Sequence, residues 1–198
     1  MTTLIVPGLH GSGAEHWQSW LEARIPGARR VLQHDWDTPD LPRWADAVER
    51  ALDTATGRIV LVAHSFGCLA AVTAAARHAD RIAGALLVAP ADPAKFGVGP
   101  QLPKEHLGYP CILVASRNDP WVALGTARHW AGRWGSRFID LGEAGHINTE
   151  SGFGPWPEAH TLWAQLVEAD ARPARRFLRE RTTAAPAPSS TPLQEIQP

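Results

Sequence analysis

The sequence has little of what metal, redox or disulfide chemistry requires. Only two cysteines, Cys68 and Cys111, occur in 198 residues, and both stand in apolar segments without metal-binding or redox spacing. No His-Glu-x-x-His or comparable pattern joins the nine histidines. We therefore expect two buried free thiols, no metal and no other cofactor.

Charge of one sign and long apolar runs are also lacking. The 19 Lys and Arg residues balance 20 Asp and Glu residues, so the net charge leaves no electrostatic footprint for nucleic acid or an anionic membrane. The one basic concentration, the arginines of 172–181, is interspersed with acidic residues, which favours a solvated helix face over a binding patch. No run approaches the roughly 18 apolar residues of a membrane-spanning helix. The first residues also lack the charged region and apolar core of a signal peptide. We expect a cytoplasmic protein that binds neither nucleic acid nor membrane, and the sequence indicates no particular protein partner.

Short apolar runs alternate with helical patterns along the chain, which predicts an α/β fold: a parallel sheet of about six strands in a three-layer α/β/α sandwich. Residues 1–181 are expected to form one domain, and 182–198, rich in Pro, Ala and Ser, a disordered tail. Pro173 divides the last helical region into 156–171 and 174–181. The strand candidates are 2–6, 29–33, 58–63, 83–89, 111–115 and 136–141.

The segment 58–67 is a buried-strand run that ends in Ser65, and an alanine-rich helical stretch, 69–79, follows it. This is typical of a nucleophile elbow, a strained turn whose neighbours two residues away must be small. Those neighbours are Ala63 and Gly67, whereas the usual pattern has glycine at both. The alternative is an ordinary turn in which Ser65 only caps the helix.

Partners for a serine nucleophile follow in the order acid, then base. Asp119 comes after the 111–115 run, and His146 comes after the 136–141 run. In this hypothesis Ser65 attacks a carbonyl, His146 takes and returns the proton, and Asp119 orients the imidazole. Asp119 has competitors: it also suits a turn before a proline, and the rival acids are Asp92 and, more weakly, Asp140. His64 is a poor base, because adjacent strand side chains point to opposite faces.

The glycine-rich segment 7–13 follows the first strand candidate and precedes a helical pattern. Acyl transfer needs two N–H groups aimed at the developing oxyanion, and we expect them at Phe66 and at Leu9, with His10 as an alternative to Leu9. A dinucleotide-binding loop is the rival interpretation, but the Gly-x-x-Gly-x-Gly spacing reverses the usual order.

Nine tryptophans are many for this length. Trp17, Trp20 and Trp44 have helical spacing and apolar neighbours, which favours core packing. Trp121 and Trp156 follow the proposed acid and base, so we expect them to line a substrate pocket together with His10. The remaining histidines, His16 among them, are expected to make ordinary surface or helix contacts.

Three longer segments add a resemblance: 7–17 (PGLHGSGAEHW), 35–44 (DWDTPDLPRW) and 145–157 (GHINTESGFGPWP). With these, the chain from Thr2 to Val167 is similar to the small single-domain α/β-hydrolases related to the retinoblastoma-binding serine hydrolase and to YdeN-type esterases. The resemblance implies the sheet order 2-1-3-4-5-6, no lid domain, and the family's serine, aspartate and histidine at Ser65, Asp119 and His146. The Leu-x-Cys-x-Glu motif for retinoblastoma-protein binding is absent, so that partner is not implied.

These patterns together predict a serine hydrolase of the carboxylesterase type that cleaves small carboxylic esters, or less readily amides, through an acyl-Ser65 intermediate. Two alternatives stay open: a catalytically weak binding or regulatory protein on this scaffold, and an acyltransferase. The longest irregular insertion, 90–110, should border the pocket as a partial flap. A pocket without a lid favours short acyl groups.

Overall fold

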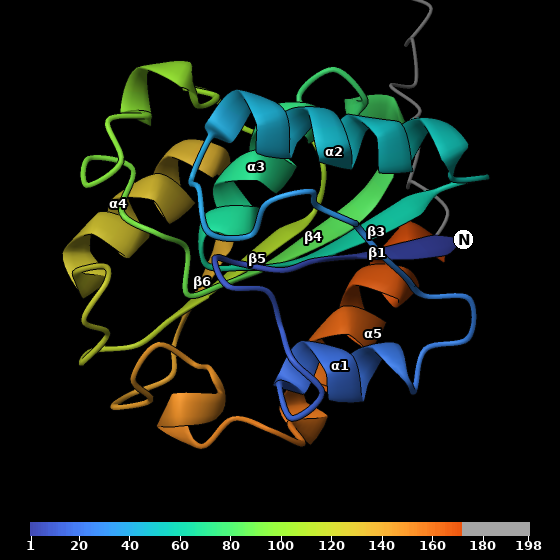
Figure 1. Ribbon diagram of the computed structural model, residues 1–198. Helices are drawn as coiled ribbons and strands as arrows, with labels where there is room; N and C mark the ends of the chain where they lie inside the picture. The colour runs from blue at the N-terminus through green and yellow to red at the C-terminus, as the bar shows by residue number, and fades with distance from the viewer. Residues whose placement is uncertain (172–198) are drawn as a thin grey trace, which may run out of the picture.

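The computed structural model describes residues 1–171, which build one six-stranded parallel sheet with helices on both faces (Figure 1). Its strand order, β2-β1-β3-β4-β5-β6, confirms the predicted order. The strands are β1 (Thr2–Val6), β2 (Arg29–Arg30), β3 (Ile59–His64), β4 (Ile82–Val88), β5 (Cys111–Ala115) and β6 (Arg137–Asp140). All neighbouring pairs run parallel, which confirms the predicted α/β class.

Helices α2 (Leu41–Thr54), α3 (Phe66–Ala75) and α4 (Leu124–Trp134) cover one face of the sheet, while α1 (Trp17–Glu22) and α5 (Pro157–Ala171) cover the other (Figure 1). Alternate residues of each strand serve the two layers. In β3, Leu61 joins the core beneath α2 and α3, whereas Val60 and Val62 join the core beneath α1 and α5. Because β3 is buried on both faces, its sequence is continuously apolar rather than alternating.

Helix α2 shows how the sequence sets the ends of an element. Asp40 caps its first turn by accepting a hydrogen bond from the Arg43 N–H group (3.2 Å), and Pro42 occupies an early position where no N–H donor is needed. Its apolar stripe, which includes Trp44 and Val48, is buried against the sheet layer. Such an amphipathic helix owes most of its stability to this burial.

Some boundaries differ from the sequence-based expectation. Strand β2 has two residues instead of the five predicted over 29–33, since after Val31 donates to the Ile5 carbonyl the chain leaves the sheet. Helix α3 covers Phe66–Ala75 rather than 69–79, because it begins directly at the turn and ends before a 3₁₀ turn, Ala79–Arg81. The predicted helix 174–181 and the predicted tail 182–198 lie outside the described residues, so the domain boundary stays a prediction.

Both cysteines are buried and unbridged, as expected. Burial raises the pKa of the Cys111 thiol to about 12, so it stays protonated at neutral pH. Within residues 1–171, no helix has the length and apolar character to span a bilayer.

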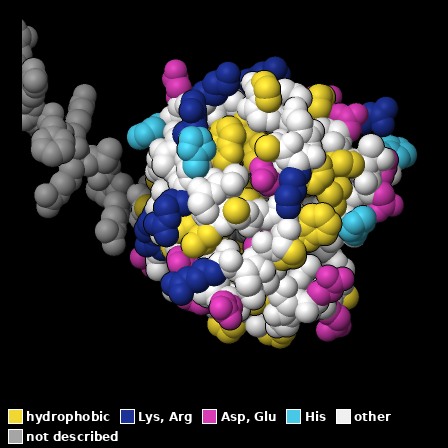
Figure 2. All heavy atoms as spheres, turned by 90° about the vertical axis from the view of Figure 1, so that its left-hand side faces the viewer, with side chains coloured by type: hydrophobic (Ala, Val, Ile, Leu, Met, Phe, Trp, Pro, Cys, Tyr) yellow, Lys and Arg dark blue, Asp and Glu magenta, His cyan; other side chains and the backbone are white. Residues whose placement is uncertain are grey.

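The carboxyl ends of the strands lie together at the left-hand side of Figure 1, where the loops after β1, β3, β4 and β5 meet. Figure 2 views the molecule from that side. Hydrophobic side chains appear there in several separate patches, with histidines and charged residues of both signs between them. Ser65, Asp119 and His146 all follow strands that end at this edge.

Candidate active site

Ser65 occupies a strained turn between β3 and α3. Its backbone has φ 53° and ψ −127°, a combination that a residue with a side chain rarely adopts. The surrounding bonds hold it there, since its N–H group donates to the Val88 carbonyl (3.0 Å) and its own carbonyl accepts from Cys68 N–H (3.0 Å). The Ser65 side chain makes no capping hydrogen bond, so the turn differs from an ordinary helix cap and has the strained serine that the nucleophile-elbow prediction requires.

Small residues let the loop after β1 approach this turn. A Cβ atom added at Gly67 would collide with the Pro7 carbonyl oxygen, and one added at Gly8 would lie 2.6 Å from the Cβ atom of Ser65. Ala63, where the usual pattern has glycine, is fully buried within β3 and fits without disturbing the pairing with β1. The demand for a small residue is therefore strictest on the helix side of the turn.

The structure brings Ser65, His146 and Asp119 into one hydrogen-bonded chain. His146 Nε2 lies 2.9 Å from Ser65 Oγ, and His146 Nδ1 lies 2.9 and 3.0 Å from the two carboxylate oxygens of Asp119. A carboxylate only accepts hydrogen bonds, so the network assigns the proton of the neutral ring to Nδ1 and leaves a lone pair on Nε2 facing the hydroxyl. The Asp119 side chain is fully buried, and Trp121 N–H donates to it as well (2.8 Å).

The rival acids and the rival base make other contacts. Asp92 accepts a hydrogen bond from Ala94 N–H (2.9 Å). Asp140 accepts from Gly142 N–H and pairs with Arg117 at 2.9 Å; both interactions, the Gly142 bond first, lower the pKa of Asp140. His64 Nε2 lies 3.0 Å from the carbonyl oxygen of His146. None of the three reaches the hydroxyl of Ser65 or the Nδ1 atom of His146.

Two backbone N–H groups beside Ser65 are left without a partner. Among residues 1–171, the hydrogen bonds include none from Leu9 N–H or from Phe66 N–H, which opens α3 and so has no intrahelical acceptor. His10 N–H, in contrast, donates to the Trp36 carbonyl (2.9 Å). The structure thus favours Leu9 over His10 as the second donor beside the nucleophile.

A cavity of about 380 Å³ opens above Ser65. His10 and Trp121, both predicted to contact substrate, line it, and Trp121 is 53% exposed at its border. Ala91 and Phe96 of the 90–110 insertion line it too, as the flap prediction requires. Its other lining residues are Leu9, Gly11, Gly13, His16, His64, His146, Asn148, Thr149 and Glu150.

The prediction for Trp156 needs correction, because this side chain is buried in the core and does not line the cavity. Its ring packs edge-on against Trp17 (centroids 5.3 Å apart) and Phe153 (5.4 Å). Trp156 directly precedes α5 and packs in the same core layer as the apolar side of that helix, and this packing determines its position. The sequence does not show whether the side chain of a single loop tryptophan points into the core or into a pocket.

His16 was expected to make ordinary contacts, yet it is buried and lines the cavity. Its Nδ1 atom accepts from Gln18 N–H (3.1 Å) and caps α1. Burial, followed by the charges of Arg30 and His146, lowers the pKa of His16 to about 4, so the ring is neutral at pH 7. The adjacent His-Trp pair at a helix start was the only sequence signal for this residue.

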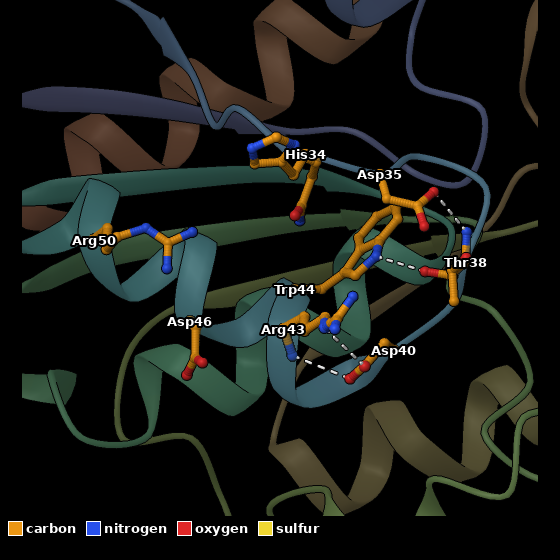
Figure 3. A pocket seen from close by; sticks show the side chains of 9 residues that line it. His34, Asp35, Thr38, Asp40, Arg43, Trp44, Asp46 and Arg50 are labelled. Carbon is orange, nitrogen blue, oxygen red and sulfur yellow. Dashed lines mark hydrogen bonds and ion pairs between the residues drawn. The ribbon is translucent and has the colours of Figure 1, made fainter.

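A second cavity, of about 290 Å³, lies between α2 and the segment that precedes it (Figure 3). Its polar groups mostly hold that segment in place: Trp44 Nε1 donates to the Thr38 carbonyl (3.0 Å), and Asp35 accepts from Thr38 N–H (3.1 Å). It contains no serine or cysteine nucleophile. Within residues 1–171 no group of three His, Cys, Asp or Glu side chains is placed to hold a metal ion. The cavity above Ser65 is therefore the candidate active site.

Comparisons with known proteins give the family and the fold of the chain. The chain matches the model of a family described as serine hydrolase over residues 3–165. It is 41% identical to a YdeN-like hydrolase from Pectobacterium atrosepticum, with a TM-score of 0.80 over 85% of this chain and 91% of that one.

More distant structures share the fold alone. The ydeN product of B. subtilis is 20% identical (TM-score 0.70; 84% of this chain, 98% of that one), and Est1E from Butyrivibrio proteoclasticus is 15% identical (TM-score 0.65; 86% and 88%). Sequence comparison with curated proteins gives no significant match. On the family model and the Pectobacterium relative together, the chain belongs to the serine hydrolase family of small α/β-hydrolases related to YdeN.

Proposed function

We propose that the protein is a carboxylesterase-type enzyme that cleaves small carboxylic esters through an acyl-Ser65 intermediate. The observation that supports this most directly is the 2.9 Å contact between Ser65 Oγ and a His146 ring whose other nitrogen is bound by a buried Asp119 carboxylate. Hydrolysis itself follows from membership of the family.

In the first half-reaction, Ser65 Oγ bonds to the ester carbonyl carbon while its proton passes to His146 Nε2. The negative charge that develops on the carbonyl oxygen is stabilised by the N–H groups of Leu9 and Phe66. When the tetrahedral intermediate collapses, the bond to the alcohol oxygen breaks and His146 gives its proton to that oxygen. The alcohol leaves and the acyl group stays on Ser65.

In the second half-reaction, a water molecule attacks the acyl carbon while His146 takes one of its protons. Collapse of this second intermediate breaks the bond to Ser65 Oγ, which receives the proton back from His146, and the carboxylic acid leaves. Asp119 accepts the hydrogen bond from His146 Nδ1 throughout and stabilises the imidazolium that forms twice in each cycle.

The substrate range that the cavity supports is that of short acyl chains. A volume of about 380 Å³ is at the low end for ligand pockets, and an exposed Trp121 rather than a covering domain forms part of its border. A series of p-nitrophenyl esters with acyl chains of two to twelve carbons tests this part of the proposal. We expect the highest kcat/KM at the short end, and an optimum at the long end would contradict it.

The decisive experiment is labelling with a fluorophosphonate probe, followed by identification of the modified residue. We expect a single adduct on Ser65. Ser65→Ala should prevent labelling and reduce turnover of p-nitrophenyl acetate by on the order of 10⁶-fold, with an unchanged circular dichroism spectrum. If the wild-type protein does not react, or if the variant hydrolyses the ester as fast as wild type, the proposal is wrong and a binding role on this scaffold is favoured.

A further inference from the structure

Two buried side chains hold the backbone on which His146 stands. His64 Nε2 donates to the His146 carbonyl oxygen (3.0 Å), and Trp17 Nε1 donates to the next carbonyl oxygen, that of Ile147 (2.9 Å). His64 is 5% exposed and Trp17 is fully buried. A carbonyl oxygen only accepts, so the neutral His64 ring must carry its proton on Nε2.

The backbone needs this support because it is strained at this point. Ile147 has φ 49°, a left-handed conformation that is a genuine outlier for a β-branched residue. Two further bonds act on the same segment: Ser151 Oγ accepts from His146 N–H (3.0 Å), and the Ala144 carbonyl accepts from Ile147 N–H (3.1 Å). Strained positions of this kind persist only where the surroundings determine them.

The two donors are themselves fixed to the sheet. His64 ends β3 and directly precedes Ser65, so the strand that presents the serine also presents the group that holds the base. Trp17 begins α1, and the neighbouring Gln18, fully buried, donates to the carbonyls of Val6 (3.1 Å) and Val62 (3.0 Å). The rings of Trp17 and His64 pack edge-on, with centroids 6.1 Å apart.

His64 can do this without adding charge beside the base. Its ring centroid lies 4.9 Å from that of His146 and 4.9 Å from that of His16. Burial, followed by the charges of His146 and His16, keeps the pKa of His64 well below its usual value. The ring therefore stays neutral and does not oppose the proton that His146 must accept.

We propose that His64 is a positioning residue for His146, with Trp17 as a second support. The two hydrogen bonds hold the imidazole at hydrogen-bond distance from the Ser65 hydroxyl. The proposal rests on the proposed function, because it assigns His146 the role of the base. It gives a role to the polar ring of the residue before the serine, which is buried and makes its hydrogen bond to the His146 carbonyl.

The test compares His64→Phe, which keeps a ring but cannot donate, with His64→Gln, whose amide can donate. For His64→Phe we expect kcat on p-nitrophenyl acetate to fall by about 10- to 100-fold, since small displacements of a catalytic group have effects of this size. KM should change little, and the rate of fluorophosphonate labelling should fall in parallel with kcat. His64→Gln should recover most of both rates, and His129→Gln, an exposed histidine on α4, should match wild type.

Thermal unfolding and circular dichroism establish that each variant is folded. A folded His64→Phe protein with wild-type kcat would overturn the proposal, as would equal losses in the Phe and Gln variants. If His64→Phe does not fold, the deciding variant is Trp17→Phe, which removes only the second donor. It should lower kcat with little change in KM. A wild-type kcat in this variant would overturn the proposal. Wild-type labelling at Ser65 keeps these outcomes separate from failure of the proposed function.

Discussion

Glycines reach the left-handed backbone region at both edges of the sheet, but residues other than glycine do so at one edge only. At the carboxyl edge, in turns that follow strands, four non-glycine residues have positive φ: His10, Ser65, Ala89 and Ile147. At the amino edge, in turns that lead into strands, the residues with positive φ are all glycines: Gly27, Gly57, Gly108 and Gly135. Within residues 1–171, backbone strain is thus concentrated at the edge that holds the candidate site.

This contrast between the edges reflects the steric cost of positive φ, which differs between glycine and residues with a side chain. A glycine adopts positive φ at no steric cost, so the amino edge closes its turns without strain. A side chain in the same conformation costs roughly 1–3 kcal/mol, which is tolerated where it places a reactive group. In the proposed function Ser65 is such a group, and Ile147 directly follows another, His146. Changes at the carboxyl edge should therefore affect activity more than stability, and changes at the amino edge the reverse.

After Ser65→Ala, the largest effect is expected for Asp119→Asn, which also lies at the carboxyl edge. The amide can donate to His146 Nδ1, which would move the ring proton to Nε2 and remove the lone pair facing Ser65. We expect kcat to fall by about 10⁴-fold with a small change in the free energy of unfolding, measured by urea denaturation. Retained activity would mean that another group orients the base, with Asp92 and Asp140 the first to examine.

A smaller effect on activity is expected for Leu9→Pro, which removes the N–H group assigned to the oxyanion. Loss of one such donor costs about 10²- to 10³-fold in kcat. Leu9→Ala, which keeps the N–H group and shortens only the side chain, is the matched control and should stay near wild type. Equal rates for the proline and alanine variants would move the second donor elsewhere in the loop.

The pH dependence of stability should report the buried histidines of the carboxyl edge. The pKa of His16 is lowered to about 4 in the folded protein, so below pH 6.5 the unfolded chain binds a proton that the folded chain does not. Stability is therefore fully present above pH 6.5 and falls as the pH decreases toward 4. From His16 alone we expect a loss of about 2 kcal/mol by pH 5.

His16→Asn keeps a residue that can cap α1 and removes the titrating ring. Urea denaturation at pH 7.5 and pH 5 should show a smaller difference in the free energy of unfolding for this variant than for wild type. If the two differences are equal, His16 is not the group responsible, and His64, whose pKa is lowered in the same direction, becomes the candidate.

The smallest effect is expected for Gly135→Ala at the amino edge. Gly135 ends α4 with φ 67°, and a Cβ atom there would lie 2.9 Å from the exposed His106 ring, which can move aside. The free energy of unfolding should fall by roughly 1–2 kcal/mol. The value of kcat for the folded protein should not change, and a loss of kcat would break the contrast between the two edges.

Much of the fold could be predicted from local patterns. Buried strands such as β3 are continuously apolar, and the resemblance supplied the sheet order. The ends of elements were less predictable. Strand β2 is short because the chain leaves the sheet after the Val31 N–H group donates to β1, and this depends on where β1 lies beside it. The end of α3 likewise depends on the turn into β4.

The site was predictable to the extent that its residues follow strands. The positions of the Trp156 and His16 side chains were not predictable, because the direction in which a side chain points depends on packing between distant segments. Trp156 meets Trp17, and His16 meets His64, only once the helices lie on the sheet. Nothing near either residue in the sequence identifies its neighbour.

The sequence by itself determined that a serine, an aspartate and a histidine would reach one edge of a parallel sheet, because each follows an apolar run and parallel strands end on the same side. Only the tertiary structure decided which acid meets the imidazole, which two N–H groups beside Ser65 lack an acceptor, and which buried rings donate to the backbone at His146 and Ile147. These depend on hydrogen bonds of about 3 Å between residues far apart in the chain, which exist only when strand order and helix packing have fixed both partners.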